Sequence, residues 1–323
     1  MKRSTTVAAA AGVMGVLSLG AVSAGVPDAL LWAYSPAPKS TPEYKLGPGP
    51  YKAPNGKLFT GPQIDKMELR AMDWAPSQHP PAPPIIVGPT GKAGPAPCGE
   101  CHGIAGAGIA NLPDLAGLPA EYIVQQVHAF QSGERRSSDP DRFATQMMAK
   151  VAKAASEAQI REAAAYFAKT PRYARIKVVE SDTGPTTITE RFNWYYRSGS
   201  GVQRLDGRVI EVPENVPLGF MYDPSVLQLA YVPKGSIRRG ADLVRAGGRG
   251  GQPCATCHGP DLKGLGLAPP LAGRDPSYLA RMLWDIKSGA RRGSPVALMQ
   301  GPASGFSPAE ITDVAAYLAS LKP

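Results

Sequence analysis

Four cysteines are all that this chain of 323 residues contains, and they form two pairs that are each followed by a histidine. The two runs, both Cys-x-x-Cys-His, comprise Cys98, Cys101, His102, Cys254, Cys257 and His258. Two thiols at this spacing can each form a thioether with one of the two vinyl groups of a haem. The adjacent imidazole then lies beneath the ring, where it can ligate the iron. The sequence therefore predicts two covalently bound haem c groups.

Other uses of paired cysteines fit this sequence less well. Two pairs that share one zinc ion are usually about 15–20 residues apart, whereas a far longer stretch separates Cys101 from Cys254. A thioredoxin-like redox pair needs a βαβ context, which is missing around both motifs. Two local disulfides in an exported protein remain an alternative to haem.

The two motifs belong to an internal repeat. Cys98 recurs as Cys254, 156 positions later. Other pairs at the same distance are His102 and His258, Pro113 and Pro269, Tyr122 and Tyr278, and Arg135 and Arg291. Beyond Arg292 the distance becomes 151, which pairs Met148 with Met299 and Ser156 with Ser307. A unit repeated in this way predicts two domains of the same fold.

Each copy predicts the same order of elements. A loop rich in glycine and proline follows the motif and ends in Pro-x-Leu-Ala-Gly. An amphipathic helix led by Tyr122 or Tyr278 comes next, and then a methionine-bearing loop. The last helix begins at Ser156 or Ser307, where a serine and a Gln or Glu three residues later indicate a capping box. The second copy also predicts a helix over 238–245, before its motif.

This set of motifs resembles the class I cytochrome c domain, and the pair resembles the fused di-haem cytochromes of the cytochrome c4 type. The resemblance covers roughly 98–170 and 236–323. It implies a mainly α fold, with two class I cytochrome c domains joined by a small β-rich insert. It also implies that His102 and His258 are proximal iron ligands and that a loop methionine completes each iron. The carbonyls of Pro113 and Pro269 would accept the N–H of these histidine rings and fix the imidazoles.

The methionine ligands follow from the same alignment. Met299 is the methionine of the second loop, whereas the first loop offers Met147 and Met148. The offset and the distance to the next helix both favour Met148. Met282 aligns with a glutamine on a helix and is interpreted as core filler, and His128 is interpreted as a packing residue rather than a ligand. Arg135 and Arg291 could pair with haem propionates, although solvated arginines are an equal alternative.

The chain divides into five segments. Residues 1–24 are typical of a signal peptide with a cleavage site after Ala24, so we expect export to the periplasm. An uncleaved anchor, which would hold the protein at the membrane, is the alternative. Residues 25–97 predict a proline-rich N-terminal arm, residues 98–171 the first cytochrome c domain, residues 172–235 the β-rich insert, and residues 236–323 the second domain.

The arm and the insert carry few patterns of their own. A helix is predicted at 64–74, where Ile64, Met67, Ala71 and Trp74 share one face. We expect it to pack on the first haem domain and to replace the helix that precedes the motif in the second copy. His79 lies among prolines and is predicted to be solvent-exposed. Strands are predicted at 176–180, 188–196, 208–212 and 227–232. Whether the insert binds a partner or braces the two domains is left open.

Function follows from the resemblance and from charge. The resemblance implies an electron carrier between extracytoplasmic redox proteins in a respiratory or dehydrogenase-linked chain. A haem subunit of a larger dehydrogenase is the alternative. A third possibility is an enzyme. A di-haem peroxidase would need a vacant coordination position on one iron, and a thiosulfate-oxidising enzyme would need a cysteine outside the two motifs. The net charge of +9 suits an acidic redox partner or an anionic membrane. No nucleic-acid partner is expected.

Overall fold

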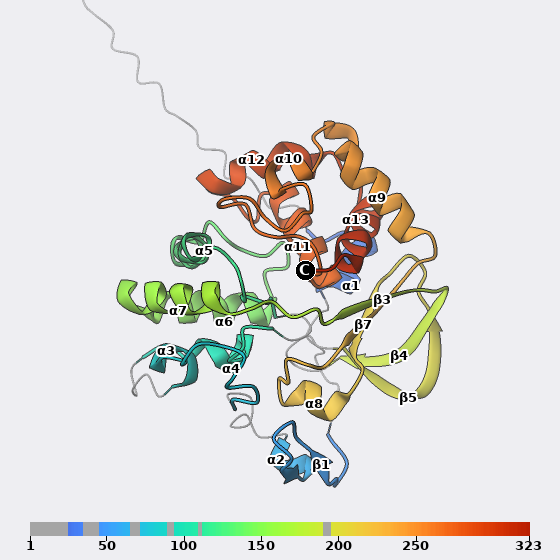
Figure 1. Cartoon of the computed structure of the whole chain (residues 1–323). Helices are drawn as coiled ribbons and strands as arrows, with labels where there is room; N and C mark the ends of the chain where they lie inside the picture. The colour runs from blue at the N-terminus through green and yellow to red at the C-terminus, as the bar shows by residue number, and fades with distance from the viewer. Residues whose placement is uncertain (1–24, 35–44, 65–71, 89–93, 109–111, 190–194) are drawn as a thin grey trace, which may run out of the picture.

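The structure of the chain, a computed structural model, describes residues 25–34, 45–64, 72–88, 94–108, 112–189 and 195–323 (Figure 1). The predicted signal peptide lies outside these residues, and so do Met67 and Ala71 of the helix expected at 64–74. Within the described ranges, every helix is too short or too polar to cross a bilayer. The longer helices lie within residues 98–169 and 236–320, and most of the strands lie between these two stretches.

The first helical unit contains α4 (Cys98–His102), α5 (Ala120–Ser132), α6 (Phe143–Ala154) and α7 (Glu157–Lys169). Helices α5 and α7 pack against each other around a buried core that includes Ile123, Ile160 and Phe167. The short helix α3 (Pro84–Val87) lies just before the motif and contacts both α4 and α7. Helix α3 therefore precedes the first motif as α9 precedes the second, whereas residues 65–71 of the helix expected to take this place lie outside the described residues.

The second unit repeats this arrangement with α9 (Ser236–Ala246), η3 (Gly248–Gly250), α10 (Ala255–His258), α11 (Pro276–Lys287), α12 (Ser294–Ser304) and α13 (Pro308–Ser320). Helix α9 confirms the expected helix over 238–245, and it crosses α13 closely. A Cβ at Gly240 would lie 2.0 Å from the backbone oxygen of Asp313, so only glycine permits this crossing. Both predicted capping boxes are present, at Ser156 with Gln159 and at Ser307 with Glu310.

The predicted methionine-bearing loops are helices, so this expectation was wrong. Met147 and Met148 lie within α6, and Met299 lies within α12. Apolar residues at positions 143, 147 and 151 and at positions 144, 148 and 152 lie four apart along α6, as on the faces of a helix. Pro295 stands in the first turn of α12, where its missing N–H costs nothing.

The insert contains β3 (Ile176–Glu180), β4 (Thr183–Thr189), β5 (Tyr195–Arg204), β6 (Ile210–Pro213), α8 (Val216–Phe220) and β7 (Gln228–Val232). Strand β7 pairs in parallel with β3 and antiparallel with β6, whereas β4 and β5 form a separate antiparallel pair. Ile188 is paired with Tyr196 across β4 and β5. The run 188–196 is therefore not one strand but the ends of two, and its residues 190–194 lie outside the described ranges.

The insert is joined to the second unit by its apolar face. Ala230 and Val232 of β7 are fully buried and belong to the same core as Val314 and Ala315 of α13. Ile176 and Val178 of β3 pack against this core as well, and α13 contacts β3. The alternation of buried and half-buried residues along β7 turns every second side chain toward this helix.

The arm is more ordered than its composition predicts. Its first described part, η1 (Asp28–Leu30) and α1 (Leu31–Tyr34), is buried in the core of the second unit and contacts α11 and α13. Further along, β1 (Tyr51–Lys52), β2 (Leu58–Phe59) and α2 (Gly61–Ile64) form a small folded part of the arm beside α8. One part of the arm thus packs on the second unit and another part packs on the insert.

Ile64 and Trp74 do not pack mainly on the first haem domain, as the sequence suggested. They lie in a cluster with Tyr196, Phe220 and Met221 of the insert. The indole Nε1 of Trp74 donates a hydrogen bond to the backbone oxygen of Met221 at 2.8 Å. The apolar side chains of this part of the arm are buried against the insert, which contributes the stacked rings of Tyr196 and Phe220 to the cluster.

His79 was predicted to be exposed, and this prediction was wrong. Its side chain is only 3% exposed. Nε2 lies 2.9 Å from a carboxylate oxygen of Asp73, and Nδ1 lies 2.8 Å from the backbone oxygen of Pro80. The hydroxyl of Tyr166 on α7 lies 3.1 Å from Nδ1. Polar partners on the arm and on α7 satisfy both nitrogens of the ring, which allows it to be buried.

Glu211 on β6 makes stability depend on pH. Its carboxylate is buried and accepts a hydrogen bond from the backbone N–H of Ser277 at 3.2 Å. Burial, and after it the charge of Asp275, raises the pKa of Glu211 to about 8. A group whose folded pKa is raised stabilises the fold below its unfolded pKa and loses that contribution as the pH rises through the folded value.

We therefore expect the free energy of unfolding to fall by about 2–4 kcal/mol between pH 5 and pH 8.5, because a difference of one between the folded and unfolded pKa corresponds to roughly 1.4 kcal/mol. Glu211→Gln keeps an oxygen acceptor for Ser277 but cannot ionise, so its stability should vary much less over this range. Denaturant unfolding at both pH values measures the difference. An identical pH dependence in the two proteins would contradict the assignment.

Candidate haem sites

A cavity of about 350 Å³ lies against α4 in the first unit. Cys98, Cys101 and His102 stand on its wall, together with Pro113 from the loop that follows the motif. Most of the remaining wall is apolar and comes from α5, α6 and α7, including Ile123, Val127, Phe130, Met147, Met148, Val151, Ile160 and Phe167. A cavity with apolar walls, two thiols and an imidazole fits a covalently attached haem.

His102 is fixed for ligation by the loop that it precedes. Its Nδ1 donates a hydrogen bond to the backbone oxygen of Pro113 at 2.9 Å, which leaves Nε2 as the nitrogen that would bind iron. Burial lowers the pKa of His102, which favours the neutral imidazole that a metal ion requires. The hydrogen bond that the resemblance implied is therefore present.

The second unit repeats this geometry. Nδ1 of His258 donates to the backbone oxygen of Pro269 at 2.8 Å, and burial lowers the pKa of His258 as well. The acceptor is again the eleventh residue after the histidine. The same histidine-to-proline hydrogen bond therefore occurs beside each cysteine pair, and the two units contain equivalent candidate haem sites.

The cysteines are thiols held close to each histidine. Burial raises the pKa of Cys98 to about 12 and that of Cys254 to about 11. The four thiols are not joined in disulfides, so each is available for a thioether. Cys257 is exposed, whereas Cys101, its counterpart in the first unit, is half-buried. The two sites therefore differ in how openly they face the solvent.

The methionines lie close to the two sites. Met147 and Met148 both stand on the wall of the first cavity, so the structure keeps both candidates. Met299 is half-buried and packs in a cluster with Ile286, Val296 and Ala303 of the second unit. Assignment of Met148 and Met299 as iron ligands stays a prediction.

Two other residues lie elsewhere than expected. Met282 is not core filler, because it stands on the wall of the first cavity and its sulfur accepts hydrogen bonds from Arg291 at 3.1 Å and from Arg135 at 3.5 Å. His128 does not pack in the core. Its exposed ring lies 2.8 Å from a carboxylate oxygen of Glu157. It thus belongs to the surface of α5, away from the cavity wall.

The two units meet through equivalent loops. Arg135 and Arg291, which occupy the same position in the repeat, form an antiparallel backbone bridge. Their side chains share one acceptor, the amide oxygen of Gln126, at 3.0 and 2.7 Å. Arg135 also stands on the wall of the first cavity, where its positive charge would favour the reduced haem. Contact of either arginine with a propionate stays a prediction.

Several residues of the first cavity were not predicted from the sequence. Tyr222 reaches the wall from the insert, and Tyr278, Arg281 and Asp285 reach it from α11 of the second unit. The hydroxyl of Tyr34 donates to Asp285 at 2.6 Å, which ties the arm to the same wall. These residues are far apart in the sequence, and the repeat alone carries no signal that would bring them together.

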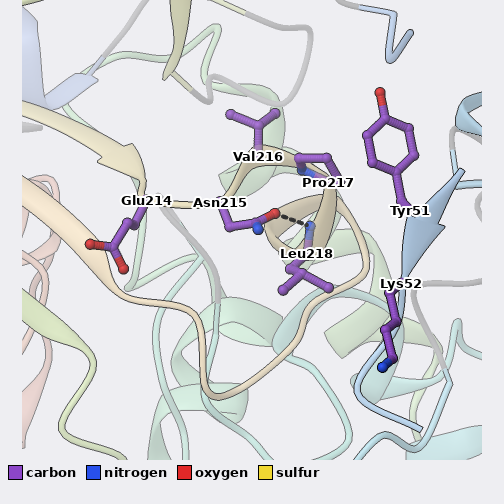
Figure 2. Close-up of a pocket in the computed structure, with 7 residues that line it drawn as sticks. All are labelled: Tyr51, Lys52, Glu214, Asn215, Val216, Pro217 and Leu218. Carbon is purple, nitrogen blue, oxygen red and sulfur yellow. Dashed lines mark hydrogen bonds between the residues drawn. The ribbon is translucent and has the colours of Figure 1, made fainter. Parts of the chain in front are cut away.

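Figure 2 shows a different cavity, of about 410 Å³, between β1 and α8. Its lining residues are Tyr51, Lys52, Glu214, Asn215, Val216, Pro217 and Leu218. The side chain of Asn215 accepts a hydrogen bond from the N–H of Leu218 at 3.1 Å and so caps α8. None of these lining residues is a cysteine, a histidine or a methionine, so they do not provide the groups that attach or ligate a haem.

The helical units and their paired sites define a c-type cytochrome with two haem groups. The family model for cytochrome c matches residues 92–171 and 238–322, which together make up about half of the chain. This chain belongs to the cytochrome c family, and it is a di-haem protein of the cytochrome c4-like kind with two covalently bound haem c groups. It is an electron carrier that works with redox partners.

Two individual relatives align with this chain over more than two thirds of its length. The thiosulfate dehydrogenase electron acceptor of Thiomonas intermedia is 26% identical over 256 residues, 78% of this chain and 87% of that protein. Cytochrome c4 of Pseudomonas aeruginosa is 24% identical over 237 residues, 72% of this chain and 87% of that protein. The solved structure of thiosulfate dehydrogenase (TsdBA) from Marichromatium purpuratum shares 21% identity, with a TM-score of 0.48, over 80% of this chain and only 40% of that chain.

Proposed function

We propose that this cytochrome takes single electrons from a dehydrogenase outside the cytoplasm and passes them to a respiratory acceptor. Its axial ligands are His102 with Met148 and His258 with Met299. The observation that supports this proposal best is the duplicated arrangement in which a buried imidazole is fixed by a proline carbonyl beside a cysteine pair. Such an arrangement holds a haem without leaving the imidazole free to rotate.

The residues of each site have separable tasks. When bound, each haem supplies an iron that gains and loses one electron. The cysteines fix the ring covalently, the apolar side chains of α5 and α7 keep water from it, and the histidine and methionine hold the metal at constant coordination. Methionine ligation raises the reduction potential, which suits the high-potential part of a respiratory chain.

The proposed ligand sets disfavour catalysis of bond chemistry. Such chemistry needs an open iron position, and a methionine would fill it at both irons. An iron site with a cysteine ligand would need a further cysteine, whereas all four cysteines belong to the two attachment motifs. We therefore propose a carrier rather than an enzyme. We propose that residues 1–24 act as a signal peptide for export to the periplasm, where the protein would be either free or held at the membrane by its N-terminus.

A dedicated haem subunit of a dehydrogenase complex is the second candidate. It is favoured by the relative from Thiomonas intermedia, whose name describes an electron acceptor of thiosulfate dehydrogenase. Gentle solubilisation followed by size-exclusion chromatography separates the two candidates. A complex that survives this treatment favours the subunit, whereas a cytochrome that elutes alone favours the mobile carrier.

The carrier proposal is tested on the mature protein purified from a host that attaches haem c. We expect two haems per chain by haemochrome assay, low-spin signals for both irons in paramagnetic resonance, and two one-electron steps in a potentiometric titration. Peroxide turnover should be negligible. A five-coordinate iron in the resting protein, or rapid peroxide turnover, would instead support an enzyme.

A further inference from the structure

One buried arginine connects the two loops that hold the proximal histidines. These segments, 113–117 and 269–273, which we call the proximal loops, contain the prolines that accept hydrogen bonds from the two imidazoles. The side chain of Arg274 is 2% exposed, and its Nε donates to the backbone oxygen of Pro270 at 2.6 Å. Its Nη1 donates to the backbone oxygen of Asp114 in the first unit at 3.1 Å and forms an ion pair with the carboxylate of that residue. A single guanidinium group therefore holds both proximal loops.

The residues that Arg274 holds are next to the acceptors of the imidazoles. The acceptor of His102 is the residue directly before Asp114, and the acceptor of His258 is the residue directly before Pro270. A chain of covalent and hydrogen bonds therefore runs from one imidazole to the other through Arg274. This chain passes through protein groups only, on the histidine side of each site.

A second arginine reinforces the contact between the proximal loops. Arg172 follows α7 of the first unit, and its Nη2 donates to the backbone oxygen of Ala272 in the second unit at 2.9 Å. The same nitrogen lies 3.4 Å from a carboxylate oxygen of Asp114, and both side chains are 13% exposed. Asp114 is thus shared by two largely buried arginines, one from each unit. Because little water reaches this contact, its ionic hydrogen bonds are stronger than those of an exposed ion pair.

The contact is made by residues in which the two copies differ. The repeat pairs Asp114 with Pro270 and Leu118 with Arg274. Leu118 is buried in the apolar core of the first unit, and the side chain of Pro270 cannot accept a hydrogen bond. Each copy therefore contributes a different half of one ion pair. Such complementary differences serve a contact between the copies rather than a task within either one.

We propose that Arg274 is a positioning residue for both haems, which acts through Asp114 and Pro270 to fix the two proximal loops relative to each other. The inference rests on the proposed ligation by His102 and His258, and it adds that neither imidazole is positioned by its own unit alone. The guanidinium group keeps its charge in proteins, and its planar fork fixes the direction of each N–H. Its positive charge also disfavours the ferric state of an iron held by either loop, which raises the reduction potential.

The test uses the purified protein with both haems attached. Arg274→Leu introduces the residue that stands at the equivalent position of the first copy, and it removes the hydrogen bonds to both proximal loops. We expect the g-values of both low-spin irons to shift in paramagnetic resonance, because the acceptor of each imidazole loses its support. In a potentiometric titration, the equilibrium constant for one-electron reduction should fall at least about threefold at both haems, because a buried positive charge is lost. A change confined to one iron would overturn the shared role.

Two further variants separate charge from geometry. Asp114→Asn keeps an oxygen acceptor but removes the negative charge, so the equilibrium constant for reduction should rise at least about threefold at both haems. Arg274→Lys keeps the positive charge but lacks the planar fork, so it should restore the equilibrium constants to within about twofold of the parent protein while the g-values stay shifted. Changes of the same sign in Arg274→Leu and Asp114→Asn would overturn the proposal, because a loss of packing alone has no reason to follow the sign of the charge.

Arg204→Leu is the matched control. Arg204 lies on β5 of the insert, where its side chain is 78% exposed and pairs with Asp206. We expect its g-values to equal those of the parent protein and its equilibrium constants to stay within about 1.5-fold, because solvent and salt screen an exposed charge. Shifts as large as those of Arg274→Leu would overturn the proposal. A parent protein without two low-spin signals would overturn the proposed ligation and this inference with it, whereas a low-spin parent whose variants shift at one iron only would overturn this inference alone.

Discussion

A chain in which Cys98 and Cys101 are both replaced by alanine is expected to carry one covalently bound haem instead of two. Each thioether needs a thiol, and the two cysteines stand on the wall of the first cavity. Without its haem, this apolar cavity of about 350 Å³ would admit water, which weakens the packing of α5 on α7. Haemochrome assay and intact-protein mass measure the loss directly.

The mirror variant, with Cys254 and Cys257 replaced by alanine, is the control for this prediction. It should lose the other haem and keep the first. Thermal unfolding should also separate the two variants, because residues of α11 complete the wall of the first cavity and lose their contacts when that haem is missing. Two covalent haems retained in either variant would contradict the attachment sites.

What the sequence predicts well is local. The spacing of Cys98, Cys101 and His102 carries the attachment chemistry within one helical turn. The capping boxes at Ser156 and Ser307 each involve a residue three positions away, and both are formed. The hydrogen bonds of both histidines to proline carbonyls followed from a family resemblance, because no local pattern ties residues eleven positions apart in a loop.

What the sequence does not predict depends on contacts between distant segments. Residues 30–34 read as part of an irregular arm, yet Leu30 and Tyr34 are buried in the core of the second unit. His79 is buried because Asp73 and Tyr166 provide partners for its ring. The alternating pattern at 188–196 suits one strand as well as two strand ends, and only the pairing of Ile188 with Tyr196 distinguishes them. The pattern of side chains along a segment indicates whether it forms a strand or a helix, but it does not indicate which other segment it packs or pairs with.

The repeat shows the same limit at the scale of domains. The repeat predicts two similar units, but only the structure shows which residues form the contact between them. Arg135 and Arg291 are equivalent in sequence and paired in space, as expected of a contact between two copies related by an approximate twofold axis. Tyr222 has no counterpart in the repeat, because it belongs to the insert. Part of the asymmetry between the two sites therefore arises outside the repeated units.

Replacing Met299 by leucine is expected to open the second iron. Leucine fills a similar volume but has no sulfur, so the cluster with Ile286 and Val296 should remain packed. The methionine-to-iron absorption band should fall to about half. The reduction potential of that haem should fall by on the order of 100 mV, since axial ligands together span about 0.8 V. Near-infrared spectra and a potentiometric titration measure both effects.

Met147 and Met148 provide a matched pair for the first iron. They are neighbours on α6, both line the cavity, and leucine at either position changes the packing to a similar degree. We expect Met148→Leu to remove the band of the first haem and Met147→Leu to preserve it. The reverse result would mean that the offset between the two copies is 152 at this methionine and falls to 151 only between it and Ser156. Loss in neither variant would show that another group, rather than a methionine of α6, ligates this iron.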